Sequence, residues 1–163
     1  ALALLPQPGF VLWTRPLILN HDFKYRGTAI FIADEEGILE ALVTTIALED
    51  VEAALVYFDH DAEAVVFTPT ETALGQEGIR RRLQELFDAF RVTRFALRKV
   101  LPCEEGVRTQ IDYAFQHRQS RETIDGVVRV IASFRDGKII RWLEYQDAER
   151  VGAFMRLIAR HKK

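Results

Sequence analysis

A carboxylate, Glu144, lies within the strand-like part of the segment Asp136–Asp147 (DGKIIRWLEYQD). An Asp-Gly pair, which readily forms a tight hairpin turn, opens this segment, and the residues after it are rich in Ile, Trp and Tyr. Side chains alternate across a strand, so Glu144 shares one face with Ile140 and Trp142. The acid therefore lies either at the solvent edge of an apolar strip or on the wall of a pocket, where it could do acid–base chemistry.

A second acid, Asp112, lies in another β-rich segment, residues 107–118. Alternation gives this segment one polar face and one apolar face. The polar side chains are Gln110, Asp112, Gln116 and Arg118, and the apolar ones are Ile111, Tyr113 and Phe115. Taken by itself, this pattern favours a polar face turned to solvent, with Asp112 pointing outward.

Other groups of residues that could support chemistry are weak candidates. Asp59-His60-Asp61 has residue types that bind metals, but the end of a helix explains it more simply, so we expect no metal site. Gly75 and Gly78 are not followed by the Gly-Lys-Ser/Thr of a phosphate loop. No Ser-His-Asp or Cys-His spacing stands out, and the sequence implies no cofactor.

Three helices are predicted in the first half of the chain. The first begins after Asp34, the second is capped by Asp50, and the third begins at Gly75 and has the clearest apolar stripe. Residues 64–68 favour a short strand, and residues 68–74 a loop. Before the first helix, the β-rich runs Phe10–Leu19 and Phe23–Ile32 favour an edge hairpin or arm over residues 1–33, followed by a domain over residues 34–163.

Four β-rich segments follow the third helix, at residues 94–101, 107–118, 127–135 and 138–146, and Asp147 caps a final helix. The short connections between consecutive segments imply antiparallel pairing. Helices followed by such a meander predict an α+β domain with helices packed on one face of an antiparallel sheet.

Composition excludes several classes of protein. The 163 residues suit one domain, with 48% apolar and 28% charged residues. A net charge of −2 gives no general attraction to nucleic acid or to an anionic membrane, and no apolar run approaches the roughly 18 residues of a membrane span. The single cysteine fits a reducing compartment, so we expect a cytoplasmic protein.

Three segments, in this order, resemble the SnoaL-like branch of the nuclear transport factor 2-like superfamily. Tyr57–Ala62 (YFDHDA) is similar to the family's Asp-Asp-Ala segment, Gly75–Ile79 to its helix start, and Asp136–Asp147 to its closing strand with Trp, Tyr and Asp. The resemblance covers residues 34–150. It implies a cone-shaped, curved sheet with a pocket at its mouth, and commonly a homodimer through the outer face of the sheet.

Two branches of the superfamily suggest how a pocket could act. The ketosteroid isomerase branch fits poorly, because Thr68 replaces its catalytic aspartate. The limonene epoxide hydrolase branch fits better: its base-bearing strand resembles Trp142–Asp147, which implies Glu144 as the base, and its Arg-x-Asp strand resembles Gln110–Asp112, which implies Asp112 as the second acid. Gln110 replaces the arginine, so a neutral amide stands where the family has a cation.

Against the alternation pattern, the resemblance thus places Asp112 beside Glu144 in the pocket, with Gln110 as an orienting amide. Two carboxylates in an apolar cavity cannot both ionise cheaply, so the pKa of one is expected to rise. The predicted pocket walls are Trp142, Tyr57, Phe58, Phe67 and Ile140. We expect either a cofactor-free enzyme of the epoxide hydrolase, cyclase or isomerase type, acting on a compact, mostly apolar molecule, or a non-catalytic binding or dimerisation module with the same fold.

The predicted dimer follows from the same assignment of faces. If Asp112 faces the pocket, the apolar residues Ile111, Tyr113 and Phe115 lie on the outer face, where a second copy could cover them. This predicts a sheet-to-sheet homodimer centred on Tyr113 and Phe115. The alternative is a monomer in which residues 1–33 cover that face.

Overall fold

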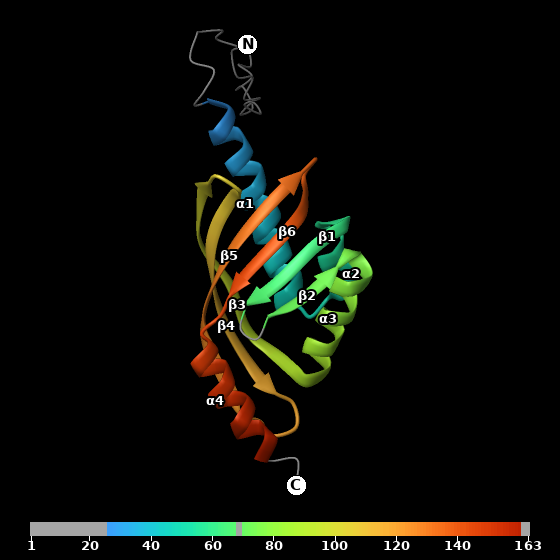
Figure 1. The fold of residues 1–163 in the computed structure, drawn as a ribbon, viewed down its shortest axis with the longest axis vertical. Helices are drawn as coiled ribbons and strands as arrows, with labels where there is room; N and C mark the ends of the chain where they lie inside the picture. The colour runs from blue at the N-terminus through green and yellow to red at the C-terminus, as the bar shows by residue number, and fades with distance from the viewer. Residues whose placement is uncertain (1–25, 68–69, 161–163) are drawn as a thin grey trace, which may run out of the picture.

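The computed structural model describes residues 26–67 and 70–160 of the chain, with side chains from residue 34 onward (Figure 1). The described part contains four helices and six strands. The helices are α1 (Arg26–Ala47), α2 (Val51–Leu55), α3 (Gly75–Ala89) and α4 (Ala148–Ala159). The strands are β1 (Phe58–Phe67), β2 (Glu71–Leu74), β3 (Phe90–Cys103), β4 (Gly106–His117), β5 (Thr123–Arg135) and β6 (Lys138–Tyr145).

The six strands form one sheet in the order β2-β1-β6-β5-β4-β3. Strands β3 to β6 form the predicted antiparallel meander. Strand β2 also pairs with β1 in an antiparallel arrangement. The pairing of β1 with β6 is parallel, so the sheet is mixed and not purely antiparallel as predicted. The predicted α+β class is confirmed.

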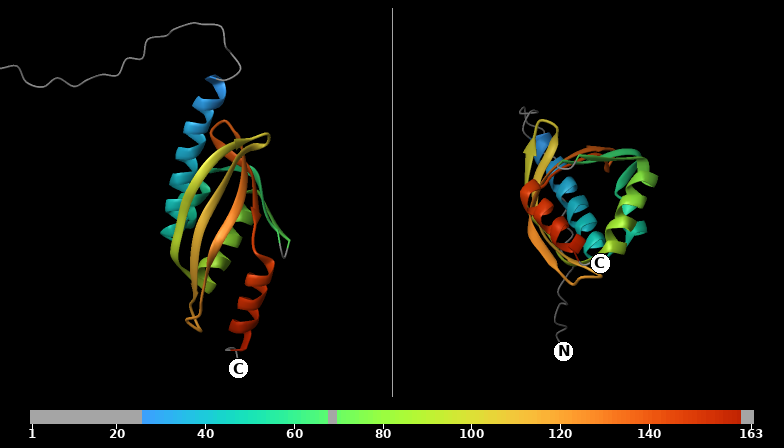
Figure 2. Two further views of the ribbon diagram at one scale, coloured as in Figure 1. Left: turned by 90° about the vertical axis from the view of Figure 1, so that its left-hand side faces the viewer. Right: turned by 60° about the horizontal axis from the view of Figure 1, so that its bottom comes forward.

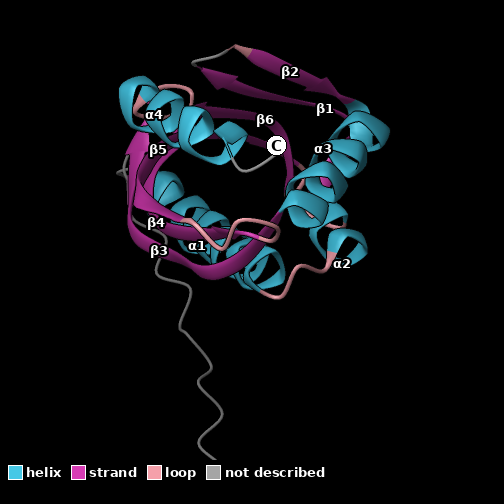
Figure 3. Cartoon of the chain, turned by 90° about the horizontal axis from the view of Figure 1, so that it is seen from below, coloured by secondary structure: helices cyan, strands magenta, loops and turns pink. Residues whose placement is uncertain are grey.

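The sheet is strongly curved, and helices occupy its concave side. Figures 2 and 3 show that it curls around α1, that α2 and α3 lie on the side the sheet leaves open, and that α4 lies across the lower end. The buried apolar side chains of α1, namely Leu39, Leu42, Val43 and Ile46, belong to the same core as residues of β4 and β5. This arrangement gives every central strand an apolar inner side, which sets the position of the site described below.

Two predicted helix caps are present. The side chain of Asp50 accepts a hydrogen bond from the backbone N–H of Ala53, and the side chain of Asp147 accepts one from Arg150. Each satisfies a backbone donor that the first turn of a helix leaves free. The predicted hairpin turn is also confirmed, since Asp136 and Gly137 both have positive φ, at 51° and 72°.

The N-terminal prediction was wrong where it can be compared. Helix α1 begins at Arg26, so residues 26–32 are helical and not part of a hairpin strand, and Asp34 lies inside the helix rather than at its cap. The predicted boundary after residue 33 also falls within α1. The prediction rested on the strand preference of Ile30, Phe31 and Ile32. This preference is weak on its own, and these residues belong to a continuous helix instead. The predicted strand Phe10–Leu19 lies outside the described residues.

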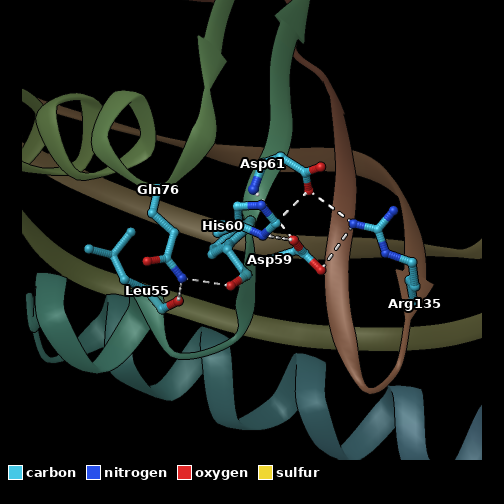
Figure 4. Close-up of polar contacts among 7 residues, drawn as sticks. Leu55, Asp59, His60, Asp61, Gln76 and Arg135 are labelled. Carbon is cyan, nitrogen blue, oxygen red and sulfur yellow. Dashed lines mark hydrogen bonds and ion pairs between the residues drawn. The ribbon is translucent and has the colours of Figure 1, made fainter.

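Strand β1 begins earlier than predicted, and the predicted loop over residues 68–74 contains strand β2 from Glu71. Asp59-His60-Asp61 therefore lies in a strand, not at the end of a helix. Gln76, at the start of α3, donates hydrogen bonds to the backbone carbonyls of Leu55 (3.3 Å) and Phe58 (2.9 Å), as Figure 4 shows. These bonds join α2, β1 and α3 at one point and fix the entry of β1 into the sheet.

Candidate functional site

A cavity of about 350 Å³ lies between the concave face of the sheet and helices α3 and α4. Its walls are mainly apolar, and seven of its lining residues are aromatic: Phe58, Phe90, Phe95, Tyr113, Phe115, Trp142 and Phe154. Helix α3 adds Ile79, Leu83 and Leu86. The volume and lining are those of a site for a small organic molecule.

Glu144 is the acid that strand β6 presents to this cavity. Its Oε2 accepts a hydrogen bond from Nε1 of Trp142 (3.2 Å), and its Oε1 accepts one from Nε2 of Gln146 (2.6 Å). Trp142, Glu144 and Gln146 all line the cavity, because they are two residues apart at the end of β6 and so lie on the same face. Both donors are neutral, and Glu144 forms no ion pair within the described part of the chain. The carboxylate is thus oriented but keeps the capacity to accept further hydrogen bonds or a proton.

Tyr113 provides a further polar group on the cavity wall. The side chain is 5% exposed, and burial raises the pKa of its phenol; the positive charge of Arg150 opposes this, while Asp147, Glu144 and Asp125 add to it. The hydroxyl therefore stays protonated at neutral pH and can donate a hydrogen bond. Among the described residues the hydroxyl has no hydrogen-bond partner, and since no fully enclosed polar side-chain atom there is unsatisfied, its oxygen keeps some accessible surface. Tyr113 itself is one of the residues that line the cavity.

A glycine makes room for this tyrosine. Gly126 on β5 is the cross-strand partner of Tyr113. A Cβ at Gly126 would lie 2.9 Å from the Tyr113 hydroxyl oxygen and 3.1 Å from two of its ring carbons. The tyrosine ring can occupy its position against the sheet only because residue 126 has no side chain.

Charged residues lie among the remaining lining of the cavity. Arg82 of α3 and Glu71 of β2 form an ion pair at 3.4 Å, and Glu85 also lines the site. Helix α4 contributes Phe154 and Met155. An ion pair between Arg150 and Asp125 joins the first turn of α4 to β5. The helix that covers one side of the cavity is therefore held to the sheet by charge as well as by apolar contact.

Asp112 and Gln110 do not lie in the cavity, and the prediction that they share it with Glu144 is wrong. Asp112 is bound by Arg98, with contacts of 2.8 Å from Nε and 2.7 Å from Nη2, and the hydrogen bond from Arg98 holds the pKa of Asp112 below its ordinary value. Gln110 is exposed and lines a groove on the opposite face of the sheet. The structure therefore does not assemble the predicted carboxylate pair.

The apolar face of β4 points inward. Ile111 is fully buried in the core, and Tyr113 and Phe115 line the cavity. They cannot form the centre of a dimer on the outer face, as predicted, because α1 and the cavity already take up that side of the strand. Association of two copies through the outer face of the sheet stays a prediction.

The remaining predicted wall residues divide into two groups. Phe58 and Trp142 line the cavity, as predicted, whereas Tyr57, Phe67 and Ile140 are not among its lining residues. Phe67 instead stacks on Tyr145, with ring centres 4.6 Å apart. The pairing of β5 with β6 is irregular at Ile140. Ser133 lies opposite Arg141 and Phe134 opposite Ile139, so Ile140 has no partner residue on β5. This bulge directs Ile139, not Ile140, into the core.

Sequence reasoning missed most of the aromatic lining. Phe90 and Phe95 of β3, Phe115 of β4 and Phe154 of α4 come from two strands and a helix that are separated in the chain. The sequence pattern that could have revealed part of this lining is the apolar face of residues 111–115, which alternation places on the side of the strand opposite Asp112.

Asp59, His60 and Asp61 offer three metal-binding atoms within 4.8 Å of one another. Arg135 already occupies the two carboxylates, at 3.2 Å from Asp59 and 3.0 Å from Asp61, as Figure 4 shows. These contacts tie the start of β1 to the β5–β6 hairpin. The cluster is at the surface and has a structural explanation in this ion pair.

The curved α+β sheet around an inner cavity defines a class of proteins, and the sequence assigns the chain to a family within it. The sequence profile of the SnoaL-like domain matches residues 39–142. The chain belongs to the SnoaL-like family. Among curated proteins, none matches it significantly in sequence.

Solved structures share the fold at low sequence identity. A protein with a ketosteroid isomerase-like fold from Catenulispora acidiphila, solved in complex with trimethylamine, has a TM-score of 0.65 and 16% identity, covering 71% of this chain and 89% of its own. A candidate polyketide cyclase from Xanthomonas campestris has a TM-score of 0.63 and 17% identity, and the match covers 76% of this chain and 97% of the cyclase chain. A candidate isomerase from Bacillus subtilis has a TM-score of 0.68 and 13% identity, and the match covers 76% of this chain and 93% of the isomerase chain. The chain is thus a SnoaL-like protein with a cavity of small-molecule size. No helix in the described part is long and apolar enough to cross a membrane.

Proposed function

We propose that this protein is a cofactor-free enzyme that moves a proton within a compact, mostly apolar carbonyl compound, with Glu144 as the proton acceptor. The observation that supports this most is the position of Glu144: one carboxylate, oriented by two neutral donors, at the wall of an aromatic cavity. A carboxylate in such a place can remove a proton from a carbon next to a carbonyl group.

Tyr113 would complete the chemistry as a hydrogen-bond donor. When a proton leaves the carbon next to a carbonyl, negative charge builds up on the carbonyl oxygen and needs a donor. The Tyr113 hydroxyl is protonated at neutral pH, belongs to a residue that lines the cavity, and has no hydrogen-bond partner in the described structure. Glu144 would then return the proton to another carbon, so that the reaction is an isomerisation or the first step of a ring closure.

Two comparisons agree with this chemistry without testing it. A candidate isomerase and a candidate polyketide cyclase share the fold. Hydration of an epoxide, which the sequence also suggested, loses support because Asp112 lies on the other face of the sheet and cannot act with Glu144.

The test is a screen of small cyclic unsaturated ketones, whose double bond moves into conjugation and changes the ultraviolet absorbance, beside a set of epoxides. We expect turnover of at least one unsaturated ketone and its loss in Glu144→Gln, an almost isosteric change that removes the base. Glu85→Gln is the matched control, because Glu85 lines the same cavity without the two neutral donors of Glu144. Equal rates in Glu144→Gln and the parent would refute the proposed role.

A second candidate function is ligand binding without turnover. The absence of Asp112 from the cavity favours it, since no second acid there is paired with Glu144 as the sequence suggested. In that case calorimetry would detect binding of the same ketones, and neither the parent nor Glu144→Gln would convert them.

A further inference from the structure

The outer face of the sheet carries a groove of about 560 Å³ that the cavity does not reach. It crosses four strands. Its main side chains are Lys99 and Leu101 of β3, Arg108 and Gln110 of β4, Arg129 of β5 and Tyr145 of β6.

Strand register brings these side chains together. Arg129 lies directly opposite Gln110 on one side and Tyr145 on the other. Arg108 lies opposite Leu101 and Ile131. In β3, the pairing shifts between Leu97 and Val100, so that two residues, Arg98 and Lys99, face the single residue Gln110. This bulge adds a third cation to the groove.

The three cations of the groove lack counter-charges. Lys99, Arg108 and Arg129 form no ion pair with any residue that the structure describes, whereas neighbouring Arg98 is neutralised by Asp112. Cations gathered in a concave site attract an anion, and guanidinium groups bind phosphate or carboxylate oxygens with two parallel hydrogen bonds.

One wall of the groove is flat and apolar. The ring of Tyr145 is 38% exposed and is stacked on Phe67, with ring planes 9° apart, which holds its orientation. Leu101 and Ile131 add apolar surface. The groove thus pairs a cationic region with an apolar shelf.

We propose that this groove binds a small organic dianion with a flat apolar body, the class that includes aryl phosphates. The cations hold the charged group, the Gln110 amide donates to it, and the body lies against Tyr145. A two-fold axis through the groove would bring its three unpaired cations against those of a second copy, so a dimer through the outer face would have its axis away from the groove. This site is separate from the cavity and does not depend on the proposed function.

Phenyl phosphate is the probe, and amide chemical shifts of the isotope-labelled full chain are the measurement. We expect saturable shifts at residues of the groove, unchanged in Glu144→Gln, and weaker binding as salt is raised. Arg108→Gln and Arg129→Gln should each lower the affinity about tenfold, the loss of one charge-assisted contact. Arg94→Gln, which removes an exposed arginine of β3 outside the groove, should leave it unchanged.

Two further probes separate the parts of the site. Inorganic phosphate should bind at the same residues more weakly, and phenol should not bind. Shifts that do not saturate, or that are equally large around Arg94, would overturn the proposal, since they indicate general attraction to a basic surface. A mass near twice 18.7 kDa that falls to one chain in Arg108→Glu would also overturn it, because a second copy would then fill the groove.

Discussion

Trp142 and Glu144 are joined by a hydrogen bond of 3.2 Å between the indole nitrogen and a carboxylate oxygen, two residues apart on one face of β6. The strand itself therefore orients its own acid. This local bond, together with the amide of Gln146, decides where the free lone pairs of Glu144 point in the cavity.

Replacing Trp142 by Phe tests that orientation. The change keeps an aromatic ring and removes the donor, so we expect a stability loss of about 0.5–1.5 kcal/mol for the hydrogen bond and some lost volume. The rate should fall further than the affinity, because a loosely held carboxylate is less often aligned with the proton. Urea unfolding and steady-state kinetics measure the two effects. An unchanged rate with lowered stability would show that the bond is only structural.

Gly126→Ala tests the place of Tyr113. A methyl group 2.9 Å from the phenol oxygen must push the ring into the cavity, so we expect roughly 1–3 kcal/mol of destabilisation and weaker ligand binding. Gly37→Ala in α1 is the control: its added Cβ would meet nothing within 4 Å, and a helical glycine replaced by alanine should stabilise by about 0.5–1 kcal/mol. Thermal unfolding of both variants checks the contrast, and equal melting temperatures would contradict it.

The phenol of Tyr113 should make stability depend on alkaline pH. Its pKa is raised above 10.0 by burial, so the folded state keeps the proton where the unfolded state has lost it. This contribution is complete below pH 10 and is lost as pH rises through the raised pKa. Tyr113→Phe should therefore lose less stability than the parent between about pH 9 and 11. Urea unfolding across that range tests it, and parallel curves for the two proteins would argue against a buried phenol.

Asp112→Asn should leave catalysis unchanged. The carboxylate contacts Arg98 on the face opposite the cavity, so its removal affects a surface ion pair. Because the folded pKa of Asp112 is lowered, any stability it adds is present above the ordinary value of 3.8 and is lost as pH falls through the lowered pKa. Turnover of the best substrate, compared with the parent at pH 7, checks this. A large loss of rate would restore the two-carboxylate mechanism.

Local patterns predicted much of the fold. The Asp-Gly turn, the caps at Asp50 and Asp147 and the four strands of the meander depend on nearby residues, and the structure contains them. The start of α1 and the parallel pairing of β1 with β6 depend on distant packing, which no local pattern records.

The site was predictable in part, and the reason for the failure is specific. Glu144 was placed correctly because Trp142 shares its face, and an apolar strip rarely points to water. For Asp112, alternation alone gave the outward position that the structure has, and the resemblance to epoxide hydrolases wrongly reversed it. Tyr113 and Phe115 need burial more than Asp112 does, and this physical demand was the better guide.

The central claim is that Glu144 accepts a proton from a molecule held in the cavity. The most direct test is exchange of solvent deuterium into the carbon next to the carbonyl group of a small cyclic ketone, followed by NMR. The parent and Glu85→Gln should exchange at the same rate, and Glu144→Gln should be slower by about 10²–10⁴-fold, the usual contribution of a general base. Exchange that is equally fast in Glu144→Gln, with the ketone still bound, would contradict the claim.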